Sequence, residues 1–600
     1  MPTSVAIAAG DSAKALAVLA DWIEEFNQAL EARSEEALAA LFLGDGYWRD
    51  FAACSWDVRT VHGASEIAVA LLRAAEPNTV REFSLEPGKA AQVVERPQPW
   101  ERSIEVLLTF DTASIRGRGY LKLVAGPGGE WLAWTLLTTP DELKGYPELI
   151  GSRRPVGELR RPPQTWLRRR AVEVEFSDRD PEVLVLGAGH SGLSIAARLK
   201  ALDIDTLVVE KNPRVGDNWR LRYDSLNLHN EVWANHLPYL LYPPTWPAYC
   251  SKDKLADWLE AYVSILDLNV WTGTSLERAS YSVQSRRWTV DLRRADGQLR
   301  TIHPRHLVLA IGAFGEARRI ALPGSENFEG EIITSQEYRS DPGTAGRRVV
   351  VVGTGSSGHD IAEDYFANRA DVTMVQRTST CIMNVETTNA LAYSLYSEDG
   401  PPLDDADIMA ASTPILLGGE LHRHMSRRMA ELDAELLSGL HAVGFKTDYG
   451  SDGTGFLMKY YRHGGGYYVN VGASQLIIDG KIKVKNGVEI ADLSGRTVVF
   501  TDGSTIDDVD TIVLAVGFRN MQDTVRNLLG DGVADAVGPV WGLREDGEVR
   551  GLYYPLDQPG LWIMGGSFVQ CRLMSKVLAI QIKAREVGII DDATPARALV

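Results

Sequence analysis

The sequence predicts an α/β protein in which two dinucleotide-binding domains follow a small α+β domain. The main observation is an internal repeat, because residues 183–210 and 349–376 each show a buried strand, a glycine-rich turn, an amphipathic helix and a second buried strand. The second observation is length, since 600 residues at about 150 per domain allow roughly four domain-sized units. The composition, 45% hydrophobic and 24% charged, is typical of a globular chain and excludes disorder over most of its length.

Charge and cysteine content exclude several function classes. The 62 basic and 80 acidic residues give a formal net charge of −18, which repels phosphate backbones and argues against a nucleic-acid partner. The four cysteines show neither a CxxC pair nor metal-ligand spacing, so we expect no disulfide framework and no metal site. The sequence contains no run of 18 apolar residues and no basic signal-peptide start, so we expect a cytoplasmic protein without a membrane span.

The first segment, residues 14–146, is expected to form the α+β domain. A helical apolar repeat between Leu19 and Leu30 comes first, and strand-like runs such as residues 104–112 follow. The stretch DGYWRDFAACSWDVRTVHGASEI at 45–67 resembles the start of NTF2-like (SnoaL-like) cone domains. The resemblance implies a structural role, including a homodimer through this domain. The less favoured alternative is a second active site built on Asp50, Asp57 and His62.

Residues 147–179 differ in composition from both neighbouring segments. Seven arginines and three prolines lie between Arg153 and Arg170, and the prolines prevent a continuous helix. We therefore expect a linker that lies on acidic domains of the same chain. The alternative is a patch for an anionic partner.

The glycine-rich turns of the repeat have the spacing of dinucleotide-binding sites. In a G-x-G-x-x-G turn the first glycine permits the bend, the second lets the backbone approach a pyrophosphate, and the third lets the helix pack on the strand. The N-terminus of the helix then offers unpaired N–H groups to the phosphates. Two copies in a strand-turn-helix-strand context predict two Rossmann-type domains. The residues are Gly187, Gly189 and Gly192 in the first copy, and Gly353, Gly355, Ser356 and Gly358 in the second.

The residue that ends each second strand distinguishes the two ligands. Glu210 ends the first copy, and an acid there accepts hydrogen bonds from ribose hydroxyls, as expected for FAD or NAD. Gln376 takes the equivalent position in the second copy and Arg377 follows. No carboxylate repels a 2′-phosphate there, and a guanidinium can pair with one. We therefore predict FAD in the first site and NADPH in the second, the alternative for Arg377 being a solvated residue at a strand end.

Three short motifs follow Glu210. They are G-x-x-W at 216–219, L-x-L-H at 226–229 and L-P-Y at 237–239. VLAIG at 308–312 and DTIVLAVGF at 510–518 complete a pattern that resembles the class B flavin-containing monooxygenases over most of residues 180–590. The resemblance implies that Gly216, Trp219 and His229 wrap the flavin, although packing alone would also explain Trp219 and His229.

One motif departs from that family. Its fingerprint F-x-G-x-x-x-H-x-x-x-[YF] is matched at 328–338 except that Thr334 replaces the histidine. Baeyer–Villiger members continue with Trp-Pro, whereas Arg339 follows here. The departure argues against a standard ketone-oxygenating enzyme and leaves an atypical Baeyer–Villiger monooxygenase as the alternative.

These patterns give the expected domain boundaries. The NTF2-like domain covers 14–146, the linker 147–179, the first part of the FAD domain 180–340, the NADPH domain 341–508 and the second part of the FAD domain 509–600. The NADPH domain is thus expected to be inserted in the FAD domain. A helical insertion at 384–475, which includes a glycine- and tyrosine-rich stretch, is expected to shape the substrate tunnel.

The resemblance implies an NADPH-consuming monooxygenase. Such an enzyme forms a C4a-(hydro)peroxyflavin with O2 and oxygenates a small organic substrate, here of N-, S- or indole/2-oxo-acid type, while the protein orients the rings and excludes water. Asn235, with Asn230 second, is the candidate residue that protects this intermediate, although either could simply cap a loop. An NADPH oxidase or reductase without oxygenation is a less favoured alternative. A disulfide reductase is rejected because Cys54 and Cys250 are far apart in the sequence.

Overall fold

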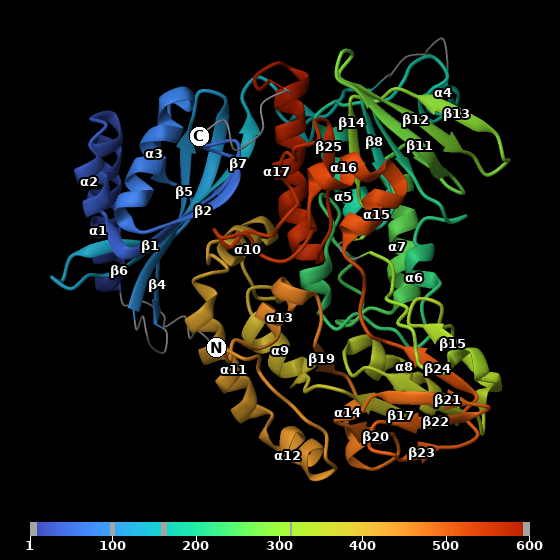
Figure 1. Ribbon diagram of the computed structural model, residues 1–600. Coiled ribbons are helices and arrows are strands. Elements are labelled where there is room, and N and C mark those ends of the chain that lie inside the picture. The colour runs from blue at the N-terminus through green and yellow to red at the C-terminus, as the bar shows by residue number, and fades with distance from the viewer. Residues whose placement is uncertain (1–8, 96–101, 158–164, 313–314, 592–600) are drawn as a thin grey trace.

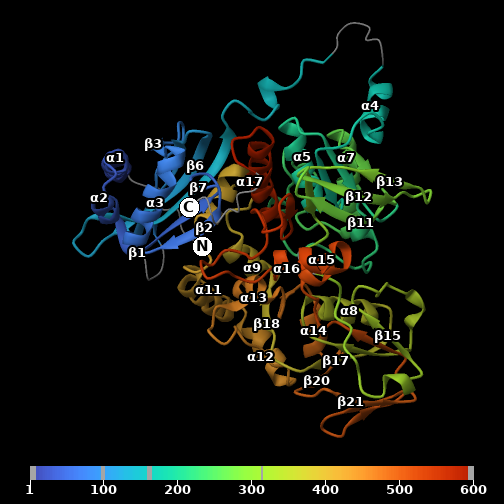
Figure 2. The ribbon, with the colours of Figure 1, turned by 45° about the horizontal axis from the view of Figure 1, so that its top comes forward.

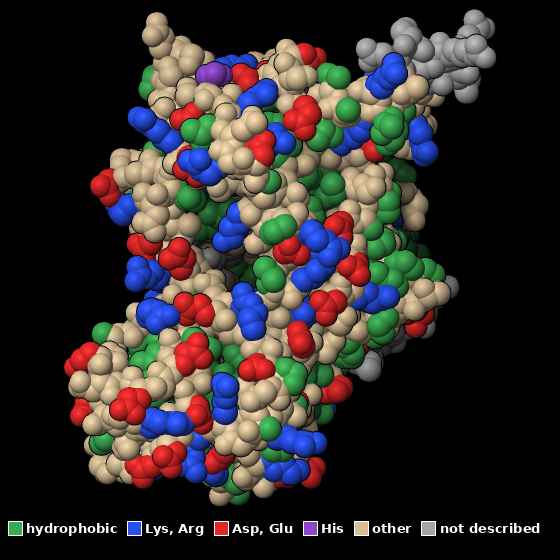
Figure 3. Space-filling model, turned by 90° about the vertical axis from the view of Figure 1, so that its right-hand side faces the viewer, with side chains coloured by type: hydrophobic (Ala, Val, Ile, Leu, Met, Phe, Trp, Pro, Cys, Tyr) green, Lys and Arg blue, Asp and Glu red, His purple; other side chains and the backbone are tan. Residues whose placement is uncertain are grey.

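The computed structural model describes residues 9–95, 102–157, 165–312 and 315–591. The chain forms three parts: an N-terminal unit and two domains with parallel sheets (Figure 1). No helix within the described ranges is both long and apolar enough to cross a bilayer. On the face shown in Figure 3, acidic and basic side chains are interspersed rather than gathered into a basic stripe.

The N-terminal unit has the predicted order of helices first and strands second. Its helices cover one face of a curved sheet, where the Phe26 ring lies 4.8 Å from Trp22 and 5.0 Å from Phe83. The opposite face of the sheet is turned toward α10 (Leu403–Ala411) and α17 (Phe568–Glu586) of the rest of the chain (Figure 1). The strand order is β2-β1-β7-β6-β5-β3, with β4 on β5, and only the β1–β7 pair is parallel. The elements are α1 (Ala9–Glu31), α2 (Glu35–Ala40), β1 (Phe42–Phe51), β2 (Val58–His62), α3 (Ala64–Asn78), β3 (Arg81–Leu85), β4 (Gln92–Glu95), β5 (Arg102–Asp111), β6 (Ile115–Ala125) and β7 (Trp131–Leu143).

The predicted linker contains a short helix, α4 (Trp166–Glu175), which begins after the prolines with Thr165 as its N-cap. Two arginines of the linker contact neighbouring parts of the chain: Arg153 pairs with Glu142, and Arg170 donates to the Leu268 carbonyl. Residues 158–164 lie outside the described part of the chain.

The first nucleotide domain is built on a five-stranded parallel sheet of order β10-β9-β8-β14-β25. Its last strand comes from the C-terminal part of the chain, so the second domain is inserted in the first, as predicted. Helix α17 packs beside α5 and starts with a capping box between Ser567 and Gln570. The elements are β8 (Val183–Leu186), α5 (His190–Ala201), β9 (Thr206–Val209), α6 (Asp217–Arg220), α7 (Lys252–Ile265), β10 (Val270–Trp271), β11 (Ser275–Ser282), β12 (Arg287–Arg293), β13 (Leu299–Ile302), β14 (His306–Leu309), β25 (Leu561–Ile563) and α17 (Phe568–Glu586).

The second nucleotide domain has a parallel sheet of order β15-β24-β16-β17-β20. Strands β15 and β24 lie outside the predicted 341–508 segment but belong to this sheet, because the fully buried β24 pairs with β15 on one side and with β16 on the other. The chain therefore returns to the first domain only after β24. The elements are β15 (Glu331–Thr334), β16 (Arg348–Val352), α8 (Ser356–Ala367), β17 (Asp371–Gln376), α14 (Ala473–Ile478), β20 (Lys483–Asn486), β21 (Ile490–Ser494), β22 (Thr497–Phe500), β23 (Thr505–Ile506) and β24 (Thr511–Leu514). Helices α15 (Met521–Leu529) and α16 (Asp531–Val537) follow, and their buried residues belong to the same apolar cluster as the core of the first domain.

The expected insertion is helical. Figure 2 shows its helices below the N-terminal unit and beside the second nucleotide domain. A short parallel pair, β18 with β19, ties its two ends together. The elements are β18 (Cys381–Asn384), α9 (Val385–Ala392), α10 (Leu403–Ala411), α11 (Gly418–Leu432), α12 (Ala434–Ala442), α13 (Gly455–His463) and β19 (Tyr467–Asn470).

Candidate functional site

The first glycine-rich turn is closed at its outer glycines and open at its middle one. Gly187 has φ +100°, and a Cβ there would lie 2.6 Å from the Ala310 carbonyl oxygen. A Cβ on Gly192 would lie 1.9 Å from the Gly187 carbonyl oxygen. A Cβ on Gly189 would meet only the Asn218 amide nitrogen, at 3.3 Å. The space in front of Gly189, at the N-terminus of α5, therefore fits an approaching phosphate.

The second turn repeats this arrangement. A Cβ on Gly353, whose φ is +110°, would lie 2.3 Å from the Ala515 carbonyl oxygen, and one on Gly358 would lie 2.2 Å from the Gly353 oxygen. The nearest atom to a Cβ on Gly355 is 3.8 Å away. Both turns thus bind their helix tightly to their strand and leave the middle glycine facing open space.

The residues that end the two second strands have different environments. The buried Glu210 carboxylate accepts hydrogen bonds from the backbone N–H of Ala188 at 3.0 Å and from the backbone N–H and side-chain amide of Asn212 at 2.9 and 2.8 Å. It is thus held beside the first turn. Gln376 is fully buried and forms two 2.8 Å hydrogen bonds with the backbone of Lys446. Gln376, at the position where Glu210 can bind a ribose in the first copy, is therefore used for packing. The next residue, Arg377, is exposed and lines the neighbouring cavity.

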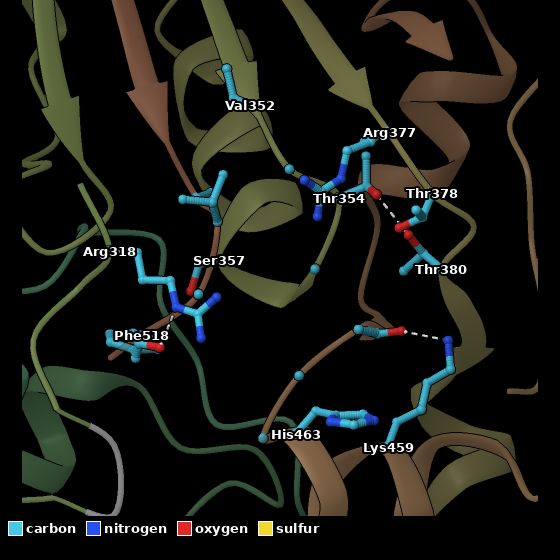
Figure 4. Close-up of a pocket in the computed structure, with 18 of the residues that line it drawn as sticks. Arg318, Val352, Thr354, Ser357, Arg377, Thr378, Thr380, Lys459, His463 and Phe518 are labelled. Atoms are coloured by element: carbon cyan, nitrogen blue, oxygen red, sulfur yellow. Dashed lines mark hydrogen bonds between the residues drawn. The ribbon is translucent and has the colours of Figure 1, made fainter. Parts of the chain in front are cut away.

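A cavity of about 1420 Å³ lies along the second turn. Arg377 and Thr378 line it just beyond the carboxyl end of β17, and Lys459 and His463 line it across from them (Figure 4). Lys459 is paired with Asp448 at 2.7 Å. Within the described ranges, no carboxylate forms an ion pair with Arg377, so its guanidinium is available for an anionic group.

A second cavity, of about 800 Å³, lies between the first nucleotide domain and the helical insertion. Ser356 and Tyr467 line both cavities, so the two adjoin at the start of α8. On the side of the first turn the lining residues are His190, Ser191, Gly312, Gly566 and Ser567, and six tyrosines also line it: Tyr393, Tyr396, Tyr460, Tyr461, Tyr467 and Tyr553.

Burial keeps tyrosine and histidine side chains of this second cavity uncharged near neutral pH. Burial raises the pKa of Tyr461 to about 12 and lowers the pKa of His422 to about 4. Burial also lowers the pKa of His190, whose Nε2 lies 3.0 Å from the Gly566 carbonyl oxygen. The apolar and aromatic lining therefore suits an uncharged organic molecule.

The residues of the motifs after Glu210 have different surroundings. His229 lines the second cavity, with Nε2 3.9 Å from the Asp360 carboxylate of α8. The buried indole nitrogen of Trp219 has no hydrogen-bond partner within the described chain, as expected where a bound group completes the site. Gly216 has φ +89°, and a Cβ there would lie 2.5 Å from the Ala256 carbonyl oxygen, so this glycine is required by packing.

The two candidate asparagines have separate surroundings. Asn230 lines the second cavity, whereas Asn235 is not among the described residues that do. The buried Asn235 amide donates to the carbonyl oxygens of Asn230 at 2.9 Å and Glu231 at 3.2 Å. Asn235 therefore closes the loop that presents Asn230.

The three polar residues of the N-terminal unit, Asp50, Asp57 and His62, have different surroundings. Asp57 is buried near Arg59 and Arg544. The buried Asp50 carboxylate accepts hydrogen bonds from the Ser55 and Thr138 hydroxyls, both at 2.6 Å, and from backbone N–H groups of the loop that follows. His62 is exposed and stacks on Tyr47. These contacts favour the structural role over a second active site.

Sequence reasoning missed several residues of the site. His190 occupies a position of the first turn that the glycine pattern leaves unspecified, and its ring stacks on Phe568, with centroids 4.3 Å apart. No sequence signal pointed to it. The tyrosines of α13 and β19 belong to the glycine- and tyrosine-rich stretch that was expected to shape the tunnel, so their signal was present but not specific.

Two glycine-rich turns on two parallel sheets, with cavities that adjoin between them, define an oxidoreductase that uses two nucleotides. Residues 184–392 match the family model described as pyridine nucleotide-disulphide oxidoreductase. Cys54, Cys250, Cys381 and Cys571 are nevertheless all buried and unpaired.

Relatives specify the family. The chain is 30% identical over 346 residues to the indole-3-pyruvate monooxygenase YUCCA1 of Oryza sativa subsp. japonica, covering 57% of this chain and 77% of that protein. It is 27% identical over 340 residues to the probable indole-3-pyruvate monooxygenase YUCCA10 of Arabidopsis thaliana, covering 56% and 82%. A solved structure of ε-caprolactone-bound cyclohexanone monooxygenase in the Loose conformation shares the fold, with a TM-score of 0.50, 17% identity and coverage of 68% and 88%.

The chain belongs to the flavin-containing monooxygenase family, a family of FAD- and NADPH-dependent enzymes. It is a flavin-dependent monooxygenase, as the sequence motifs predicted. Its fold also agrees with the prediction of two Rossmann-type domains.

Proposed function

We propose that this enzyme oxygenates a small organic substrate of N-, S- or indole/2-oxo-acid type in the 800 Å³ cavity. The observation that carries the proposal is the meeting of the two cavities at Ser356 and Tyr467. A nucleotide lying along the second turn can reach the apolar cavity there, and the first turn lies on its other side. The indole-3-pyruvate activity named for the plant relatives makes that 2-oxo acid one compound to test.

FAD would be held by the first turn. Gly189 leaves room for the pyrophosphate, and the Glu210 carboxylate accepts hydrogen bonds from ribose hydroxyls. Gly216 begins the short helix that carries Trp219, whose unpartnered indole N–H can donate to the bound group. When bound, FAD supplies hydride acceptance and the activation of O2.

NADPH would be held by the second turn. Gly355 leaves room for its pyrophosphate, and the backbone N–H groups at Ser356 face the phosphates at the start of α8. Arg377 would pair with the 2′-phosphate. In this arrangement the nicotinamide end points toward the apolar cavity.

Water exclusion would fall to the chain around the apolar cavity. His229 and Asn230 lie at its rim with Ser356, and we assign to Asn230 the polar contact that protects the reacting oxygen from release as hydrogen peroxide. The contacts of Asn235 support a positioning role, because its amide holds the Asn230 loop.

For the N-terminal unit we propose an NTF2-like (SnoaL-like) domain with a structural role. Its helices, its curved sheet and the hydrogen bonds of Asp50 support this assignment. The predicted homodimer through this domain stays a prediction, which light scattering of the purified protein would test.

The test uses purified holoenzyme with NADPH and O2. A tertiary amine, an alkyl aryl sulfide, a ketone and indole-3-pyruvate are offered separately, and NADPH consumption, hydrogen peroxide and product mass are recorded. We expect one class to gain an oxygen atom with little peroxide. An ester from the ketone would favour the Baeyer–Villiger alternative. If all electrons appear as hydrogen peroxide with every compound, the oxygenase proposal fails and an NADPH oxidase remains.

A further inference from the structure

The sheet of the N-terminal unit forms part of the wall of the 800 Å³ cavity. Two cross-strand pairs on the face of the sheet that is turned toward the rest of the chain line that cavity: Phe51 with Val58, on β1 and β2, and Glu105 with Lys122, on β5 and β6. The same cavity is lined at its other end by His190 and by Gly566 of the first nucleotide domain. One continuous space therefore extends from the first glycine-rich turn to the sheet of the N-terminal unit.

This wall is fixed to the core by a buried ion pair. The Arg49 guanidinium donates two hydrogen bonds to the Glu548 carboxylate, at 2.7 and 2.8 Å, and a third to the Ala411 carbonyl oxygen at 2.7 Å. Thr60, the cross-strand partner of Arg49, donates to the same carboxylate at 2.6 Å. Because Ala411 and Glu548 themselves line the cavity, Arg49 joins the N-terminal sheet directly to two segments of its wall.

The Arg49 contact also places the apolar pair. Arg49 and Phe51 are two residues apart on β1, so they share one face of the sheet, and the guanidinium carbon lies 4.6 Å from the Phe51 ring centroid. Val58 faces the same way as the cross-strand partner of Phe51. The ion pair between Arg49 and Glu548 therefore fixes this face of the sheet in a position where Phe51 and Val58 line the cavity.

The charges on this wall lie close to charges of opposite sign. Arg49 is neutralised by Glu548. Lys122 lies directly across from Glu105 in the sheet, and its ammonium donates to the Thr413 hydroxyl. The tyrosines and His422 elsewhere in the lining are held neutral by burial. An ionised substrate group would lose its hydration without meeting a net opposite charge.

We propose that the N-terminal domain is the distal wall of the substrate cavity, where Phe51 and Val58 limit substrate size, and that, among the classes proposed above, the substrate is an uncharged, ring-containing apolar molecule rather than an ionised 2-oxo acid. This inference rests on the proposed function, because it takes the cavity as the place of oxygenation. It assigns to the N-terminal domain a part in specificity in addition to its structural role.

The test uses two uncharged probes of different size, methyl phenyl sulfide and methyl 2-naphthyl sulfide, with methyl 4-carboxyphenyl sulfide as the charged probe. Binding to the holoenzyme is followed by the change in the flavin absorbance spectrum, and turnover by sulfoxide formed. We expect Phe51→Ala to raise the naphthyl-to-phenyl ratio of kcat/KM at least about tenfold, and Val58→Phe to lower it. The charged probe should bind more weakly than methyl phenyl sulfide to every variant.

The matched control is Phe83→Ala, which removes the same side chain from the same sheet. Phe83 is buried on the helix-covered side, 4.8 Å from the Phe110 ring, and does not line the cavity in the described structure. Flavin content and melting temperature of all three variants separate misfolding from selectivity.

Four results would overturn the inference. One is an unchanged size ratio in both Phe51→Ala and Val58→Phe, and another is an equal shift in Phe83→Ala. The third is tighter binding of the charged probe. The fourth is no binding or oxidation of either uncharged sulfide by the unmodified enzyme. In that last case the proposed function still stands if another compound class is oxygenated, so the two failures can be told apart.

Discussion

Arg572 and Asp407 form a fully buried ion pair between α17 and α10, with two hydrogen bonds of 2.7 and 2.6 Å. The remaining guanidinium nitrogen of Arg572 donates to the carbonyl oxygens of Ala234 and His236, at 3.1 and 2.8 Å. These two carbonyls flank Asn235. One side chain of the C-terminal helix therefore holds both the helical insertion and the loop that presents Asn230 to the cavity.

Breaking this pair on one side should destabilise the protein strongly. Arg572→Met leaves Asp407 buried without its counter-charge, so we expect a loss of about 3–5 kcal/mol in the free energy of unfolding, measured by denaturant titration of the holoenzyme. Arg428→Met removes an exposed arginine that pairs with Glu431 and should change little. The double variant Arg572→Met/Asp407→Leu should recover part of the free energy of unfolding that is lost in Arg572→Met. No recovery would show that the other contacts of Arg572, rather than its charge, account for the loss.

The glycines of the first turn should separate folding from flavin binding. Gly192→Ala places a Cβ 1.9 Å from a backbone oxygen, so we expect it to prevent folding of the domain. Gly189→Ala meets only a side-chain amide at 3.3 Å and should fold, but with flavin occupancy greatly reduced because the Cβ blocks the pyrophosphate. Circular dichroism and flavin absorbance after gel filtration measure the two effects. Full flavin content in Gly189→Ala would contradict the assigned site.

Coenzyme choice should depend on Arg377. One charge-assisted hydrogen-bond contact to a phosphate contributes about 1.5–3 kcal/mol, so Arg377→Ala should raise the KM for NADPH roughly ten- to a hundredfold. The KM for NADH should stay nearly the same. Lys481→Ala, which removes a cation paired with Asp479, is the control and should affect neither coenzyme. An equal loss with both coenzymes would make Arg377 a structural residue.

The free energy of unfolding should depend on pH through the ionisation of Asp57 in the N-terminal unit. Burial raises the pKa of this carboxyl to about 6 against the opposing effect of Arg544 and Arg59. The folded protein therefore holds the proton more tightly than the unfolded chain. Protonated Asp57 therefore contributes to the free energy of unfolding below pH 4. This contribution, about 3 kcal/mol, is lost as the pH rises to about 6.

The comparison with Asp57→Asn isolates this group. The difference in unfolding free energy between the unmodified protein and the variant should change between pH 4 and 6 and stay constant above that range. The same difference for Asp21→Asn, a change at an exposed position of α1, should be flat throughout. A flat curve for Asp57→Asn would mean that its carboxyl keeps its ordinary pKa.

Replacing the two asparagines, Asn230 and Asn235, should have different effects on catalysis and on stability. Asn230→Ala should leave the melting temperature nearly unchanged but raise the hydrogen peroxide formed per NADPH, because it removes a polar group at the cavity. Asn235→Ala removes two buried hydrogen bonds and should cost about 1–3 kcal/mol of stability. If Asn235→Ala uncouples the enzyme without destabilising it while Asn230→Ala does not, the two roles are exchanged.

The sequence by itself determined the parts of the molecule that depend on a few consecutive residues. Gly187 and Gly353 need positive φ, and Gly192 and Gly358 need a missing side chain, so the two turns and the helices after them could be read from spacing alone. The contrast between Glu210 and Gln376 was visible for the same reason, since each residue directly ends a strand.

Tertiary structure alone decided how these parts meet. An apolar run such as β24 predicts a buried strand but not its neighbour, because pairing depends on which sheet buries it, and β24 lies beside β16. The motifs could not separate Asn230 from Asn235, since the difference is the direction in which each amide points. The contact of Arg49 with Glu548 spans 499 positions, and no local pattern encodes it, because the burial that makes that pair strong exists only once the N-terminal sheet has packed on the core.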